Sequence, residues 1–145
     1  MTAHKALGSL VILCILALPA YAGGKGELQG YFNDAATKAK TASNPVEKRQ
    51  ILNDSFHTVS TALGIIQSLP LISKNDVEGI DHLKATLQEK QDELAGNNGY
   101  VRVRDEQLNA FSDYVVQDME QADQVITISL VTLLLIVILI VLIVK

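Results

Sequence analysis

The stretch that decides the fold lies near the C-terminus and reads VITISLVTLLLIVILIVLIV from Val125 to Val144. It has no charged residue, and its only polar side chains are Thr127, Ser129 and Thr132. At about 1.5 Å of rise per residue, a helix of this length measures about 30 Å, the thickness of the hydrocarbon core of a bilayer. A helix also pairs its backbone polar groups internally, as lipid requires. The sequence therefore predicts a transmembrane helix that contacts membrane lipid along this stretch.

The N-terminus has the pattern of a secretory signal peptide. Lys5 precedes an apolar run from Leu7 to Leu18, Pro19 ends this run, and small residues follow up to Ala22. A basic start, an apolar core and small residues at the cleavage site define such a peptide, so we predict a signal peptide over residues 1–22. The alternative is an uncleaved segment that forms a second membrane span, but the run is short and a proline interrupts it.

Together the two segments predict a single-pass membrane protein. Residues 23–124 would form a domain outside the cytoplasm, in the periplasm or at the cell exterior, or in the secretory lumen or at the cell surface of a eukaryote. Lys145 would be the cytoplasmic residue, in agreement with the bias of basic residues toward that side. A GPI-type tail fits less well, because the polar spacer of about 8–12 residues after small residues is missing.

The predicted domain is acidic and contains no disulfide. All sixteen Asp and Glu residues lie in residues 23–124, with every basic residue except Lys5 and Lys145. This balance argues against a nucleic-acid partner, which would require clustered Lys and Arg. The only cysteine, Cys14, lies in the predicted signal peptide, so the domain depends on packing or association for its stability.

Apolar residues that recur at spacings of three and four predict an all-α domain. Asn44 and Ser73 are predicted N-caps and Gly96 a helix end, while Lys90 and Gln91 interrupt the seam of the third helix. We expect a small antiparallel bundle of three to four helices with heptad-like seams, whose last helix continues into the C-terminal transmembrane helix. The expected helices cover about residues 27–42, 45–69, 74–95 and 105–144.

Two apolar stripes are candidate interaction faces. Leu28, Phe32 and Ala35 lie on one side of the first predicted helix, and Val115 and Met119 lie on one side of the last. A domain of about 100 residues buries only a modest core, so shared burial with a partner would stabilise it. The predicted partner is another protein or a second copy of this chain.

Two polar pairs on the middle helices are candidate metal ligands, Asp54 with His57 and Glu78 with His82. Their spacings place each pair on one side of its helix, and two imidazoles with two carboxylates suit zinc or iron. Such pairs occur more often as solvated residues beside an apolar seam. We therefore predict neither a metal nor any other cofactor.

Arg102 and Arg104 lie in a predicted extended connector, where two guanidinium groups could contact a carboxylate or a phosphate. Pairing with the neighbouring Asp105 and Glu106 is the commoner outcome. No serine lies in a recognisable context with a histidine and an acid, and the domain has no cysteine. We predict no enzymatic activity.

The sequence therefore favours a membrane-anchored extracytoplasmic helical module that acts by protein–protein interaction or self-association. One alternative is a sensor-type, ligand-binding bundle flanked by two membrane spans. A second is a membrane-bridging protein in which an unbroken helix couples the domain rigidly to its anchor. Asn53 also begins a glycosylation sequon, which matters only in a eukaryotic secretory pathway.

Overall fold

The computed structural model describes residues 25–125 and 128–144, so the predicted signal peptide lies outside the described residues. All regular structure in these ranges is helical, which confirms the predicted all-α class. The elements are α3 (Lys25–Thr41), α4 (Pro45–Gln67), α5 (Lys74–Ala95), the 3-10 turn η1 (Asp105–Gln107), α6 (Leu108–Val125) and α7 (Leu130–Val144).

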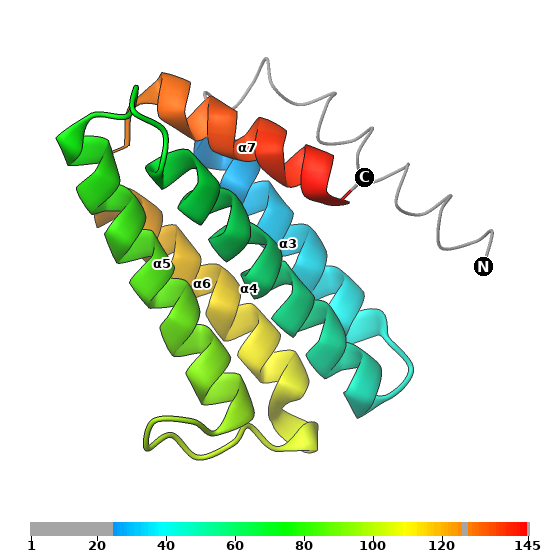
Figure 1. The fold of residues 1–145 in the computed structure, drawn as a ribbon. Helices are drawn as coiled ribbons and strands as arrows, with labels where there is room; N and C mark the ends of the chain where they lie inside the picture. Colours follow the sequence, from blue (N-terminus) through cyan, green and yellow to red (C-terminus); the bar gives the residue numbers. More distant parts are fainter. Residues whose placement is uncertain (1–24, 126–127, 145) are drawn as a thin grey trace.

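The helices from α3 to α6 run in alternating directions and form a bundle (Figure 1). α3 packs closely on α6 and on α4, and α4 packs on α5. The contact between α5 and α6 is much smaller. α7 lies on α4, and to a lesser extent on α3, near the end of the bundle where α4 ends (Figure 1).

Local chemistry sets the helix ends that the sequence predicts. The side-chain oxygen of Asn44 accepts a hydrogen bond from the Glu47 N–H at 2.9 Å, and Pro45 occupies the first turn of α4. Ser73 Oγ accepts a hydrogen bond from the Asp76 N–H at 3.1 Å. Gly96 ends α5 with a φ of 78°, a left-handed conformation that glycine adopts without strain.

The heptad seams of the sequence form the core. Each large apolar side chain buried in this way stabilises the fold by about 1.5–3 kcal/mol relative to exposure. The large seam residues that are at most 2% exposed are Phe32, Leu52, Phe56, Val59, Leu63, Ile80, Leu87, Leu108, Val115 and Met119.

A buried lysine joins α5 to α6. The Lys90 side chain is 0% exposed, and its Nζ lies 2.7 Å from the Asp118 carboxylate and 3.0 Å from that of Glu93. Lys90 Nζ also donates a hydrogen bond to the Tyr114 hydroxyl at 2.8 Å. Burial alone would lower the pKa of Lys90, but its bonds to Asp118, Tyr114 and Glu93 outweigh this effect and raise it. The ammonium group therefore stays charged inside the bundle.

The C-terminal part differs from the prediction of one continuous helix. α6 ends at Val125, Ile128 and Ser129 are not helical, and α7 begins at Leu130. Among the helices that the structure describes, none combines the length and the apolar character needed to cross a bilayer. The predicted transmembrane helix from Val125 to Val144 is thus absent from this conformation. The described chain between the two helices is held by the Ser129 N–H, which donates to the carboxylate of Asp76 on α5 and so favours the start of a new helix at this point.

We expect Gly96→Ala to destabilise the protein more than Gly99→Ala, as measured by urea unfolding. Both glycines have positive φ, 78° and 87°, so either substitution strains the backbone by about 1 kcal/mol. A Cβ at position 96 would also lie 2.8 Å from the Arg102 backbone N, whereas nothing lies within 4 Å of one at position 99. Equal losses for the two variants would contradict this packing.

We expect Asp118→Asn to lower the free energy of unfolding by about 1–3 kcal/mol, because it removes the shortest ion pair of a buried ammonium. Glu89→Gln is the matched control with the same change of charge. Its carboxylate is 49% exposed and 3.5 Å from Lys90 Nζ, so its loss should change stability little. Thermal unfolding of both variants measures the difference, and similar losses would contradict a specific role for Asp118.

Candidate functional site

Lys90 with Glu93, Tyr114 and Asp118 forms one set of polar contacts, which we call the Lys90 cluster. A second set consists of Asp76, Ser129 and Thr132, and we call it the Asp76 site. Asp76 lies in the first turn of α5 and is 5% exposed. Its Oδ1 accepts a hydrogen bond from the Ser129 N–H at 2.9 Å. Its Oδ2 accepts bonds from Ser129 Oγ and Thr132 Oγ1, each at 2.6 Å. The Asp76 site therefore ties the start of α7 to the start of α5.

Ser129 also acts as the N-cap of α7. Its Oγ accepts a hydrogen bond from the Thr132 N–H at 3.4 Å, and its carbonyl accepts one from the Leu133 N–H at 3.0 Å. The Asp76 carboxylate consequently lies where two helices begin. The partial positive charge at a helix N-terminus favours an anion there.

The hydrogen bonds of the Asp76 site favour the charged form of the acid. Burial alone would raise the pKa of Asp76, but the bonds from Ser129 and Thr132 outweigh it, so its pKa lies below the ordinary value of 3.8. Among the described residues, no basic side chain forms an ion pair with Asp76. Neutral donors from α7 and its preceding turn thus compensate this carboxylate.

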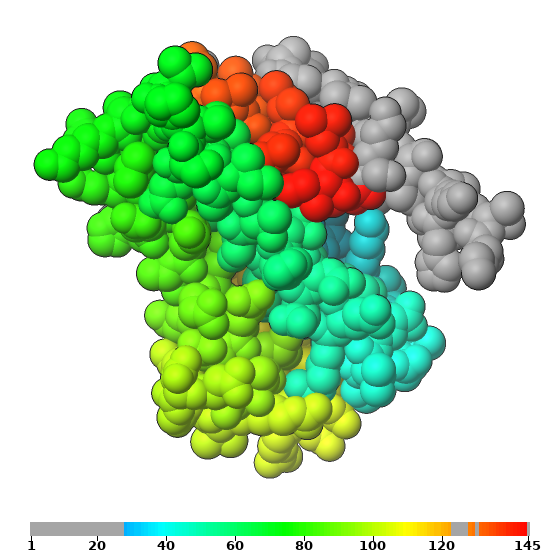
Figure 2. Space-filling model, in the orientation of Figure 1, coloured from blue at the N-terminus to red at the C-terminus, as the bar shows by residue number. Residues whose placement is uncertain are grey.

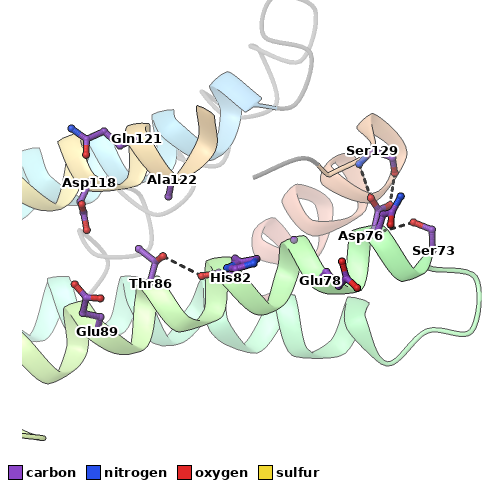
Figure 3. Close-up of a pocket in the computed structure, with 12 residues that line it drawn as sticks. Ser73, Asp76, Glu78, His82, Thr86, Glu89, Asp118, Gln121, Ala122 and Ser129 are labelled. Carbon is purple, nitrogen blue, oxygen red and sulfur yellow. Dashed lines mark hydrogen bonds between the residues drawn. The ribbon is translucent and has the colours of Figure 1, made fainter. Parts of the chain in front are cut away.

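Asp76 also lies on the wall of an open cleft between α5 and α6, which we call the acidic cleft (Figure 3). Its volume is about 870 Å³. Ten of the twelve lining residues have polar side chains, and they include four carboxylates and one imidazole: Ser73, Asn75, Asp76, Glu78, Gly79, His82, Thr86, Glu89, Asp118, Gln121, Ala122 and Ser129. Figure 3 shows Asp118 on α6 pointing toward α5 across this space. The acidic cleft begins beside the Lys90 cluster and extends to the Asp76 site.

α7 is apolar on its outer side as well as on the side that it buries. Leu133, Ile136 and Ile140 are at most 3% exposed and belong to the core. Val131 and Ile138 are 69% and 55% exposed. Figure 2 shows α7, in orange and red, at the surface beside α4. A helix at the surface of a soluble bundle normally has a polar outer face, and α7 has none.

The predicted metal ligands are not brought together as one site. Asp54 and His57 are exposed on α4, whereas Glu78 and His82 line the acidic cleft on α5. Within residues 25–125 and 128–144, no group of three or more His, Cys, Asp or Glu side chains is placed to hold a metal ion.

The two connector arginines have different surroundings. Arg104 Nε lies 3.5 Å from the Glu106 carboxylate in a surface ion pair, as expected from the neighbouring acids. Arg102 is exposed, and its backbone and Cβ pass close to Gly96. A different guanidinium, that of Arg49, holds the connector by donating to the carbonyl of Val103 and to the Asp105 carboxylate.

The predicted interaction faces lie inside the molecule. Leu28, Phe32 and Ala35 on α3 are 5%, 1% and 7% exposed, and Val115 and Met119 on α6 are each 2% exposed. α3 and α6 form the closest helix pair of the bundle. These side chains complete the core of one chain, so in this conformation a partner cannot reach them.

Sequence reasoning did not identify Asp76 as a site residue. The signal for the start of α7 is present locally, because Ser129 precedes an apolar run as an N-cap does. The partner of Ser129 lies 53 residues earlier in the chain, and no local pattern connects the two. Only the packing of α7 on the bundle brings them together.

Comparisons with known proteins assign no relative to this chain: no protein family, no curated protein and no solved structure matches it.

We expect the stabilising effect of Asp76 to disappear in acid. Because its folded-state pKa is depressed below 3.8, the contribution is complete above about pH 4.5 and is lost as pH falls through the folded-state pKa. At neutral pH, Asp76→Asn should lower the free energy of unfolding by about 1–3 kcal/mol. Urea unfolding of both proteins from pH 7 to pH 2.5 measures this difference, which should shrink below pH 3.8. A constant difference over the whole range would contradict the role of the carboxylate.

Proposed function

We propose that this protein is a membrane-anchored extracytoplasmic helical module that acts, without catalysis, by contact with another protein or with a second copy of itself. Its anchor would be the stretch from Val125 to Val144, which leaves the bundle and enters the bilayer as one helix. The predicted signal peptide supports export of the domain. The α7 seen here would be the docked form of that anchor.

The observation that carries this proposal is the apolar outer face of α7. Apart from Thr132, every residue of α7 is apolar, and the bundle covers only one side of the helix. Val131, Ile138 and Leu142 remain 69%, 55% and 61% exposed. A helix that is apolar all round is typical of a membrane span or of the interior of a large protein. Lipid covers every side of such a helix at once.

Entry of α7 into a bilayer would also free a surface for a protein partner. α7 now covers part of α4 and a smaller part of α3. Its buried residues, including Leu133, Ile136 and Ile140, belong to the same apolar cluster as the bundle core. Removing them exposes an apolar strip of the bundle, and such strips are typical of surfaces that bind another protein.

The described side chains give little support to a catalytic role. Ser73 Oγ caps α5, and Ser129 Oγ is bound to Asp76. Thr86 donates to the His82 carbonyl, so it is engaged within α5. The acidic cleft is open to solvent, unlike the enclosed pockets that bury most of a small ligand.

A double substitution on the exposed face of α7 tests membrane anchoring. Val131→Lys with Ile138→Lys changes two side chains that are exposed in the docked form, so the bundle should still fold. Each lysine should oppose entry of the helix into the bilayer by about 2.5–3.5 kcal/mol. We expect the full chain to sediment with membranes after carbonate extraction and the double variant to stay in the supernatant.

The matched control is Leu71→Lys with Val101→Lys, which adds the same charge at positions that are 88% and 89% exposed outside α7. It should sediment like the unchanged chain. Recovery of the unchanged chain in the supernatant would contradict the proposal. Crosslinking of the same membranes tests the proposed contact with another protein or with a second copy of the chain. If no crosslinked species forms, the chain has no stable partner in these membranes.

A further inference from the structure

We propose that the Asp76 site is an intramolecular docking site for the C-terminal segment, and that a lipid bilayer competes with it for that segment. This inference rests on the proposed membrane anchoring and adds the residue that controls it. The site is the one place where α7 and its preceding turn make side-chain hydrogen bonds to the rest of the described chain. The other contacts that α7 makes with described residues are those of its apolar side chains with the core.

In the docked state, with α7 packed on the bundle, the polar groups of Asp76 and of the start of α7 are hydrogen-bonded to each other. Asp76 is 5% exposed and Thr132 is 4% exposed, so each has given up hydration in the docked state and needs the other as a hydrogen-bond partner. The two hydroxyl hydrogen bonds, each 2.6 Å long, are of the short kind formed by a charged acceptor, and the bond from the Ser129 N–H has the ordinary length of 2.9 Å. Their geometry fixes where the chain turns, because the carboxylate binds both the backbone and the hydroxyl of Ser129.

In the open state, in which α7 has left the bundle, the Asp76 carboxylate can still be hydrogen-bonded. Asp76 lies on the wall of the acidic cleft, and Ser129 beside it is exposed to solvent (Figure 3). Water can therefore replace the hydroxyl groups around the carboxylate when α7 leaves. Glu78, His82, Glu89 and Asp118 line the same cleft, so the carboxylate would enter a hydrated, acidic space. Among the described residues that line the cleft, neither Lys nor Arg is present to hold Asp76 in place of α7.

In the open state the hydroxyl groups of the anchor segment can also be hydrogen-bonded. Serine and threonine hydroxyls within a helix can bond to the carbonyl of the preceding turn, so Ser129 and Thr132 need no partner outside a membrane helix. The outer face of α7, with Val131 and Ile138, gains a lipid contact that the bundle does not provide. The same segment thus has two satisfied arrangements, and the Asp76 site biases the choice between them.

The experiment measures how fast the full chain inserts into phosphatidylcholine vesicles. Unchanged protein, Asp76→Asn and Glu78→Gln are each synthesised without membranes and mixed with vesicles, and floated protein is followed with time. Asp76→Asn leaves the apolar segment itself unaltered but removes a charged acceptor. We expect it to insert about tenfold faster, because opening precedes insertion. Glu78→Gln removes the same charge from an exposed side chain on the same helix and should match the unchanged protein.

Hydrogen exchange without vesicles distinguishes release of α7 from general unfolding. In Asp76→Asn, the amides of α7 should exchange faster while those of α4 stay protected. Equal acceleration in both helices would overturn the docking role of Asp76. Equal insertion rates for all three proteins would also overturn it and leave the membrane anchor intact. Failure of all three proteins to float with vesicles would instead overturn the anchor and, with it, this inference.

Discussion

The main constraint on this structure is that α7 is apolar on every side and is destabilised wherever it contacts water. A bundle of this size can bury one face of such a helix, and α4 and α3 bury one face of α7. The other face, which includes Val131 and Ile138, stays in contact with solvent. This imbalance distinguishes α7 from α3, α4, α5 and α6, whose apolar stripes face one another and whose outer faces are mostly polar, with Val46 and Ile65 of α4 as exposed exceptions. It makes α7 the element with most to gain from another environment.

A single carboxylate decides where α7 begins and how it is directed. Asp76 binds the backbone and hydroxyl of Ser129 and the hydroxyl of Thr132, so the chain turns at this point. The same residue lies in the first turn of α5, which Ser73 caps. The docked position of α7 is therefore joined to the start of α5. Apolar contacts provide most of the area that α7 buries on the bundle, and the hydrogen bonds of the Asp76 site fix the position of its first turn.

The small interface between α5 and α6 is closed at one end and open at the other. At the closed end, Lys90 lies between Asp118, Glu93 and Tyr114 and holds the helices together. Beyond it the helices enclose the acidic cleft, which reaches Asp76. A charged residue in a heptad seam buries less apolar surface than leucine, but fewer side chains can pair with it. Here Lys90 on α5 bonds to Tyr114 and Asp118 on α6, and the acidic cleft opens beyond these contacts.

Local chemistry by itself determined the helical class and most helix ends. Asn44, Pro45, Ser73 and Gly96 act within a few residues of their own positions, so their effect could be predicted from spacing alone. The sequence also showed that the segment before Lys145 is apolar, because that property needs no partner. Only the tertiary structure decided where this segment lies, that Leu28 and Phe32 are core residues of one chain, and that Asp76 faces Ser129. These outcomes depend on contacts between residues far apart in the chain, such as the 53 residues that separate Asp76 from Ser129, and no local pattern records such contacts.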